Sequence, residues 1–134
     1  MGSPSFFSQY PQKDISIGSF TAKSPLFFRD MAFSSTAFLA DLKAVKTVLP
    51  PWVTPIVILK NYAIIVISSL EYRNSDIGPY NEISVSVMAH QRDALIYPKL
   101  NLALSLLSKS FYAHVLQLPV TTEIAVQGGI EYFN

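Results

Sequence analysis

The chain has 134 residues, enough for one domain with a hydrophobic core. Its ten basic and nine acidic residues are scattered singly and give a net charge of +1, so we expect neither a nucleic-acid partner nor an anionic membrane. Cysteine is absent, which excludes disulfides, thiolate nucleophiles and cysteine metal sites.

Hydrophobic residues make up 50% of the chain and charged residues only 14%, against roughly 25% charged residues in a typical domain. So little charge cannot cover the surface of a monomer. We therefore expect a large buried interface, either in a homo-oligomer or with a further half of the same domain.

The first twelve residues, MGSPSFFSQYPQ, lack the basic and apolar regions of a signal peptide. We interpret residues 1–12 as a disordered lead and expect a cytoplasmic protein. The most apolar window, residues 56–70, contains Lys60 and Asn61 and is shorter than the about 20 apolar residues that a spanning helix needs. Its Ile and Val content favours two buried strands, or one long bent strand.

The N-terminal part of the chain predicts strands followed by a helix. Residues 15–17 alternate apolar and polar side chains like an edge strand, and residues 33–38 (FSSTAF) are also strand-like. Asp41 stands where a helix N-cap would, and residues 42–49 carry one apolar face. Pro50 ends that helix, because proline lacks the backbone donor and restricts the preceding residue.

Most of the following segments predict strands. Apolar runs at 56–59 and 62–72 are followed by the turn formers of residues 73–79 and by alternation over residues 82–88. After a loop at residues 90–93, further apolar runs follow at 94–97, 102–107 and 111–118.

A second short helix is expected near the C-terminal end of the sequence. Thr121 or Thr122 can cap it, Glu123 suits its first turn, and Gly128-Gly129 would end it before a strand from Ile130. Many strands with two short helices predict an α+β domain that is predominantly antiparallel and barrel-like.

Three segments resemble the acetoacetate decarboxylase family. They are FLADLKAVKTVLPP at residues 38–51, DIGPYNEISVSV at residues 76–87, and LPVTTEIAVQGGIEYFN at residues 118–134. The resemblance covers most of residues 26–134 in the expected order, and members of this family are roughly twice as long as this chain. It implies an acetoacetate decarboxylase-type fold, of which residues 13–134 form the N-terminal half.

The resemblance implies a lyase that acts on a small keto acid through a lysine Schiff base, without a cofactor. In the family that lysine lies a few residues beyond a Gly-x-Glu turn, whereas Gly129-Ile130-Glu131 is followed here only by three residues. Ile130 also replaces the arginine of that turn. We therefore expect the lysine to come from outside this chain, and the chain alone to be inactive.

Two other functions stay open at this point. One is a non-catalytic small-molecule-binding or assembly protein of the same fold, and the other is a Schiff-base aldolase or dehydratase.

Glu82 is the catalytic candidate. It matches the glutamate of the family's Tyr-Asn-Glu motif as Tyr80-Asn81-Glu82, and its side chain alternates onto the same strand face as Ser84 and Ser86. Burial on such a face would raise its pKa and suit it to proton transfer. The residues alone favour an exposed glutamate at a strand start, and the resemblance reverses that preference.

Substrate-binding candidates are Arg29, Tyr80 and Tyr112. The resemblance implies an arginine that meets the substrate carboxylate, but a count without gaps places Met31 there, so Arg29 needs a shift of two residues. An ion pair with Asp30 or a neighbour is the other interpretation of Arg29. The two tyrosines are candidates for a pocket wall, with ordinary packing as the alternative.

Lys99 and the two histidines are not assigned to the site. Tyr97-Pro98-Lys99 looks like the family's lysine motif but precedes the LPVTTE segment, so we interpret Lys99 as a loop lysine. His90 and His114 have no metal-ligand spacing around them, and we expect no metal site.

Overall fold

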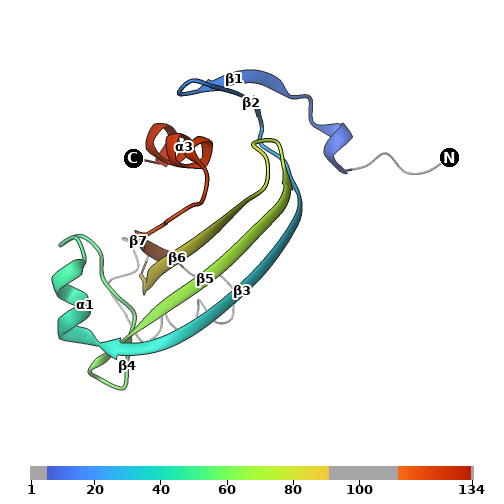
Figure 1. Ribbon diagram of the computed structural model, residues 1–134. Helices are drawn as coiled ribbons and strands as arrows, with labels where there is room; N and C mark the ends of the chain where they lie inside the picture. The colour runs from blue at the N-terminus through green and yellow to red at the C-terminus, as the bar shows by residue number, and fades with distance from the viewer. Residues whose placement is uncertain (1–5, 91–111, 134) are drawn as a thin grey trace. The chain divides into compact units, whose positions relative to one another are not determined.

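The computed structural model describes residues 6–90 and 112–133 (Figure 1). In chain order the elements are η1 (Phe6–Gln9), β1 (Lys13–Ile17), β2 (Phe20–Ser24), β3 (Phe28–Asp41), α1 (Leu42–Val48), β4 (Val57–Ile58), β5 (Tyr62–Ser75), β6 (Tyr80–Ala89), β7 (Tyr112–Gln117) and α3 (Glu123–Phe133). Strands β1 and β2 form a hairpin, and the larger sheet has the order β3-β5-β6-β7 with β4 on β5. The expected α+β class with antiparallel strands and two short helices is confirmed.

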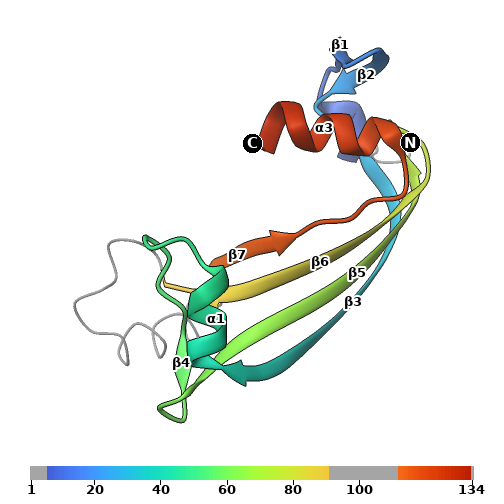
Figure 2. The same cartoon turned by 60° about the vertical axis from the view of Figure 1, so that its left-hand side comes forward.

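Within the described residues the larger sheet is open. Strands β3 and β7 stand at opposite ends of its hydrogen-bonding order (Figure 2). The closed, barrel-like arrangement that we expected is therefore not formed by these strands. The apolar runs at 94–97 and 102–107, and Lys99, lie outside the described residues.

The chain divides into two compact units. Unit 1 comprises residues 1–33, 70–82 and 120–134, and unit 2 comprises residues 34–69 and 83–119. Strands β3, β5 and β6 each contribute residues to both units.

In unit 1, helix α3 packs on the β1–β2 hairpin. The hairpin pairs Ile17 with Phe20 across a turn in which Gly18 has a φ of 56°, a left-handed conformation that suits glycine. Glu131 of α3 accepts a hydrogen bond from the Gly18 N–H at 2.6 Å. A Cβ on Gly128 would lie 3.7 Å from the Ile17 side chain, so helix and hairpin meet closely there.

The expected end of this helix is wrong. Helix α3 runs through Gly128-Gly129 to Phe133, so neither a Gly-x-Glu turn nor a strand begins at Ile130. Glycine costs about 1 kcal/mol relative to alanine in a helix, which contacts elsewhere in the fold can outweigh. Here those contacts are Gly128 against Ile17 and Glu131 on Gly18.

The chain before β1 has defined contacts from Phe6 onward. Residues 6–9 form η1, and the Phe7 ring lies 5.0 Å from the Phe27 ring. The Gln12 side chain donates a hydrogen bond to the Pro25 carbonyl at 2.8 Å. Phe7 and Gln12 therefore both contact other residues of unit 1.

Unit 2 contains the core around helix α1. The Asp41 carboxylate accepts a hydrogen bond from the Ala44 N–H at 3.0 Å, which confirms the predicted N-cap, and the helix ends before Pro50 as expected. Val45 of this helix packs with Ala63 and Val87 in a buried cluster. The partly buried residues around the cluster are Ala40, Leu42, Leu49, Ile65 and Leu116.

None of the helices within residues 6–90 and 112–133 combines the length and the apolar character needed to cross a membrane.

Candidate functional site

Two stacked tyrosines lie at the β5–β6 turn of unit 1. The rings of Tyr72 and Tyr80 have their centroids 4.4 Å apart at an interplanar angle of 25°, and Phe28 packs against Tyr72 at 4.8 Å. The turn that brings β5 and β6 together is closed by a hydrogen bond from the Gly78 N–H to the Ser75 carbonyl at 3.1 Å. Tyr80 is buried, and it lies two residues before Glu82 on β6.

The backbone at Glu82 is fixed by the segment that leads into α3. Glu82 forms an antiparallel bridge with Val120. Next to this bridge, the Asn81 N–H donates to the Thr121 hydroxyl at 2.9 Å, and the Thr121 N–H donates to the Asn81 carbonyl at 3.1 Å. Thr121 is thus committed to β6, and the Thr122 hydroxyl is buried without a partner among the described residues. The expected threonine cap of α3 is not observed.

Burial shifts the protonation of Glu82, Tyr72 and Tyr80, and the Glu82 charge acts on both tyrosines. Burial raises the pKa of the Glu82 carboxyl above its usual range. Burial is also the main reason why the pKa of Tyr72 is raised, and the Glu82 charge adds to it. Burial, followed by Tyr72 and Glu82, raises the pKa of Tyr80 still further. Glu82 can therefore exchange a proton closer to neutral pH, while both phenols remain protonated donors.

A second polar cluster in unit 1 is centred on Asp76. Its carboxylate accepts hydrogen bonds from the Arg29 guanidinium at 2.6 Å, from the Phe27 N–H at 2.9 Å and from the Gln12 amide at 2.5 Å. The Arg29 guanidinium also lies 5.4 Å from the ring centroids of Phe7 and Phe27, at cation–π distance. Burial alone would raise the pKa of Asp76, but these hydrogen bonds outweigh it and lower the pKa.

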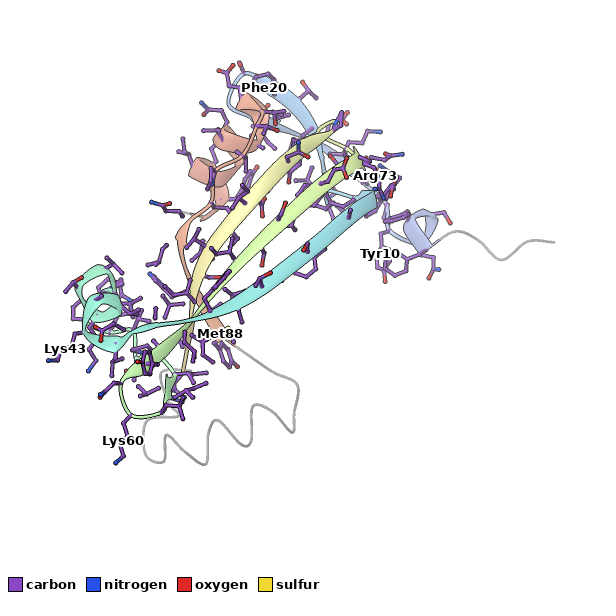
Figure 3. The ribbon with its side chains drawn as sticks, turned by 60° about the horizontal axis from the view of Figure 1, so that its bottom comes forward. Tyr10, Phe20, Lys43, Lys60, Arg73 and Met88 are labelled. Atoms are coloured by element: carbon purple, nitrogen blue, oxygen red, sulfur yellow. The ribbon has the colours of Figure 1, made fainter. Side chains whose placement is uncertain are left out.

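Arg29 forms an ion pair with Asp76, which is neither Asp30 nor a neighbour of Arg29 in the sequence. Asp30 instead accepts two hydrogen bonds from Arg73, which Figure 3 labels near the end of β5. Tyr112 belongs to unit 2, where it begins β7 opposite Ala89 and is 47% exposed. Of the predicted site residues, the structure brings Tyr80 and Glu82 together.

Sequence reasoning missed Tyr72 and Asp76. Tyr72 lies in an apolar run that predicted only a strand, and Asp76 lies among turn formers that predicted only a turn. The available signal for Tyr72 was the turn at residues 73–79, because a hairpin places residues on its two sides next to one another. Nothing local indicated that Asp76 would pair with Arg29.

Among the His, Asp and Glu residues that the structure describes, no three gather to form a possible metal site.

Comparison with protein families, with curated proteins and with solved structures found no match to this chain. The function must therefore be argued from the residues and their geometry.

Proposed function

We propose that this chain is part of an acetoacetate decarboxylase-like lyase acting on a small keto acid. In this proposal the Schiff-base lysine lies outside residues 1–134, and the barrel-like fold is completed by that further part of the domain. The observation that supports it is the Glu82 carboxyl, partly buried beside Tyr72 and Tyr80, with a pKa raised by burial. A cytoplasmic homo-oligomer is part of the same proposal.

Each of the three groups has a distinct chemical role in this scheme. Loss of CO2 from an imine leaves an enamine carbon that must take up a proton, and the best donor has a pKa near the working pH. Desolvation moves Glu82 in that direction. Tyr72 and Tyr80, which stay protonated, supply hydrogen-bond donors to an oxygen of the substrate. The imine itself withdraws the electrons, so no cofactor is required.

One observation favours a non-catalytic small-molecule-binding or assembly protein as the second candidate. The Arg29 guanidinium is already paired with Asp76 and stacked against Phe7 and Phe27, so its charge is balanced within the fold before any substrate binds. The substitution of Ile130 for the family's arginine points the same way.

The deciding experiment is borohydride trapping of the natural polypeptide with acetoacetate, followed by peptide mass mapping. We expect a reduced adduct on a lysine outside residues 1–134, and none on the 134-residue chain by itself. Glu82→Gln should keep the adduct but lower turnover by about 10² to 10⁴-fold, the usual contribution of a general acid or base. Glu71→Gln is the matched control, since Glu71 is an exposed carboxylate on β5, and it should leave turnover unchanged.

Several outcomes would overturn the proposal. An adduct on Lys99 that disappears in Lys99→Ala would show that the nucleophile lies in this chain. Wild-type turnover in Glu82→Gln would remove Glu82 from the chemistry. Absence of any adduct on the natural polypeptide would favour the binding or assembly function.

A further inference from the structure

Among the described residues, strand β3 is a sheet edge that lacks the usual protection. It is 14 residues long and stands at the end of the strand order, with no described strand along its outer side (Figure 3). Natural edge strands are usually short or carry lysine, proline, a bulge or an inward charge that prevents pairing with another chain. Residues 31–40 contain no charged residue, no proline and no glycine, and the charges of β3 stand only near its ends.

Large apolar side chains of β3 are exposed on both faces. Phe33 is 63% exposed and Leu39 is 54% exposed on one face, and Phe38 is exposed on the other face. A strand whose inner face was fully covered would instead alternate buried and exposed side chains. Large apolar side chains thus flank a row of backbone groups that have no partner strand among the described residues.

The sequence of β3 is complementary to itself in the antiparallel direction. When two sheets join around a two-fold axis into one sheet, each face of one sheet continues as the same face of the other. Residues that oppose each other across the axis therefore point to the same face. It follows that the axis passes between two copies of the same residue. With Ser35 on the axis, Met31 faces Leu39 and Phe33 faces Ala37 of the other copy. Each pair sets a larger side chain against an apolar neighbour, which favours cross-strand packing.

Charge selects this register over its neighbours. With Ser35 on the axis, Arg29 faces Asp41 of the second copy at both ends of the strand pair. An axis through Ser34 would place Arg29 opposite Leu39, and an axis through Thr36 would place Asp41 opposite Met31. The bond from Arg29 to Asp76 uses Nη1, and a guanidinium has five N–H donors, so a second carboxylate can be bound.

We propose that β3 joins two copies of this chain into one continuous sheet, with β3 of each copy antiparallel around a two-fold axis at Ser35. The pattern indicates a second copy as the partner of β3, because the sequence of β3 is complementary to itself and not to an unrelated strand. This inference does not depend on the keto-acid chemistry proposed for Glu82, and it is an alternative to closure of a barrel through the free edge of β3.

A single cysteine at the axis tests the register, since the chain contains no other cysteine. Opposed residues of antiparallel strands have Cα atoms about 4.5 to 5.5 Å apart, within the range that a disulfide spans. Ser35→Cys should therefore give a disulfide-linked dimer on mild oxidation. Ser34→Cys is the control, because its two copies would lie roughly 8 Å apart diagonally, too far for a disulfide. Ser69→Cys, exposed on β5, controls for random collision.

The oligomeric mass provides an independent readout. Sedimentation equilibrium should give a dimer for the unmodified chain and a monomer for Leu39→Lys, which sets an ammonium group opposite Met31. Leu39 is exposed, so we expect circular dichroism and thermal unfolding of the variant to match the wild type. The proposal would be overturned if the wild type were a monomer or if Leu39→Lys were a dimer. It would also be overturned if Ser34→Cys and Ser35→Cys cross-linked equally, or if β3 paired with a different polypeptide.

Discussion

Hydrogen-bonded charges join the segments of unit 1, whereas a small apolar cluster joins those of unit 2. In unit 1, Asp76 ties residues 12, 27 and 29 together, and Asp30 binds Arg73. In unit 2 the core is Val45, Ala63 and Val87, and Asp41 is the only acidic residue that the structure describes there. The two units should therefore respond differently to pH and to side-chain truncation.

The largest effect is expected at Asp76, whose side chain is 10% exposed. Asp76→Ala should lower the free energy of unfolding by about 3 kcal/mol, because it leaves a partly buried guanidinium and two further donors without their acceptor. Asp30→Ala is the control, since the Asp30 side chain is 52% exposed and an exposed ion pair contributes little to stability. Urea titration compares the two, and equal losses would contradict the difference between buried and exposed pairs.

The pH dependence of the same variant sharpens this comparison. The pKa of Asp76 is lower in the folded chain, so its contribution is present above the unfolded value of about 3.9 and is lost as pH falls through the folded value. We expect the difference in stability between wild type and Asp76→Ala to shrink below about pH 4. A difference that stays constant down to pH 2 would show that the carboxylate charge is not responsible.

Val87 tests the apolar side of the comparison. Val87→Ala should cost about 2 kcal/mol, since it removes two fully buried methyl groups and leaves a small cavity beside Val45 and Ala63. No charge is involved, so the loss should not change between pH 4 and pH 8 in the same urea titrations. Val57→Ala, on the exposed side of β4, should cost less than about 0.5 kcal/mol.

Two glycines of unit 1 should respond in opposite directions. Gly18→Ala should cost about 1 kcal/mol, because Gly18 has a positive φ and a Cβ there would lie 3.3 Å from the Gln127 side chain. Gly129→Ala should stabilise the chain by up to about 1 kcal/mol, since Gly129 is helical and nothing lies within 4 Å of its added Cβ. In thermal unfolding, the midpoint of Gly18→Ala should lie below that of the wild type and the midpoint of Gly129→Ala above it. Destabilisation by Gly129→Ala would show that α3 does not continue through residue 129.

The smallest effect is expected at Glu82. The pKa of Glu82 is higher in the folded chain than the unfolded value of about 4.3, so between these two values the folded chain binds more protons. The free energy of unfolding therefore declines as pH rises from the unfolded pKa through the folded pKa. Glu82→Gln removes this decline and should be slightly more stable than wild type at pH 7 but not at pH 3. Chemical unfolding at pH 3 and pH 7 measures the difference in free energy of unfolding between the two proteins. A wild type that is more stable than Glu82→Gln at pH 7 would contradict the upward shift of the Glu82 pKa.

The sequence predicted elements that depend on residues close together in the chain, and it did not predict contacts between distant residues. The Asp41 cap joins residues three apart, and the alternation over residues 82–88 is a local pattern, so α1 and β6 were predictable. The path of α3 through Gly128 depends on Ile17, far away in the sequence, and was predicted wrongly. Within the candidate site, Glu82 was proposed from its motif and strand position. Its neighbour Tyr72 required knowledge of how two strands pair.

The hydrogen bond between Gly18 and Glu131 has a consequence for the order of folding, because it joins residues 113 apart in the chain. During synthesis the β1–β2 hairpin leaves the ribosome long before α3, and an isolated two-stranded hairpin is marginally stable at best in water. Ile17, buried in the finished fold, must stay accessible to solvent or to chaperones until α3 arrives. Slow, non-local closure of this kind leaves the hairpin exposed to aggregation during biosynthesis.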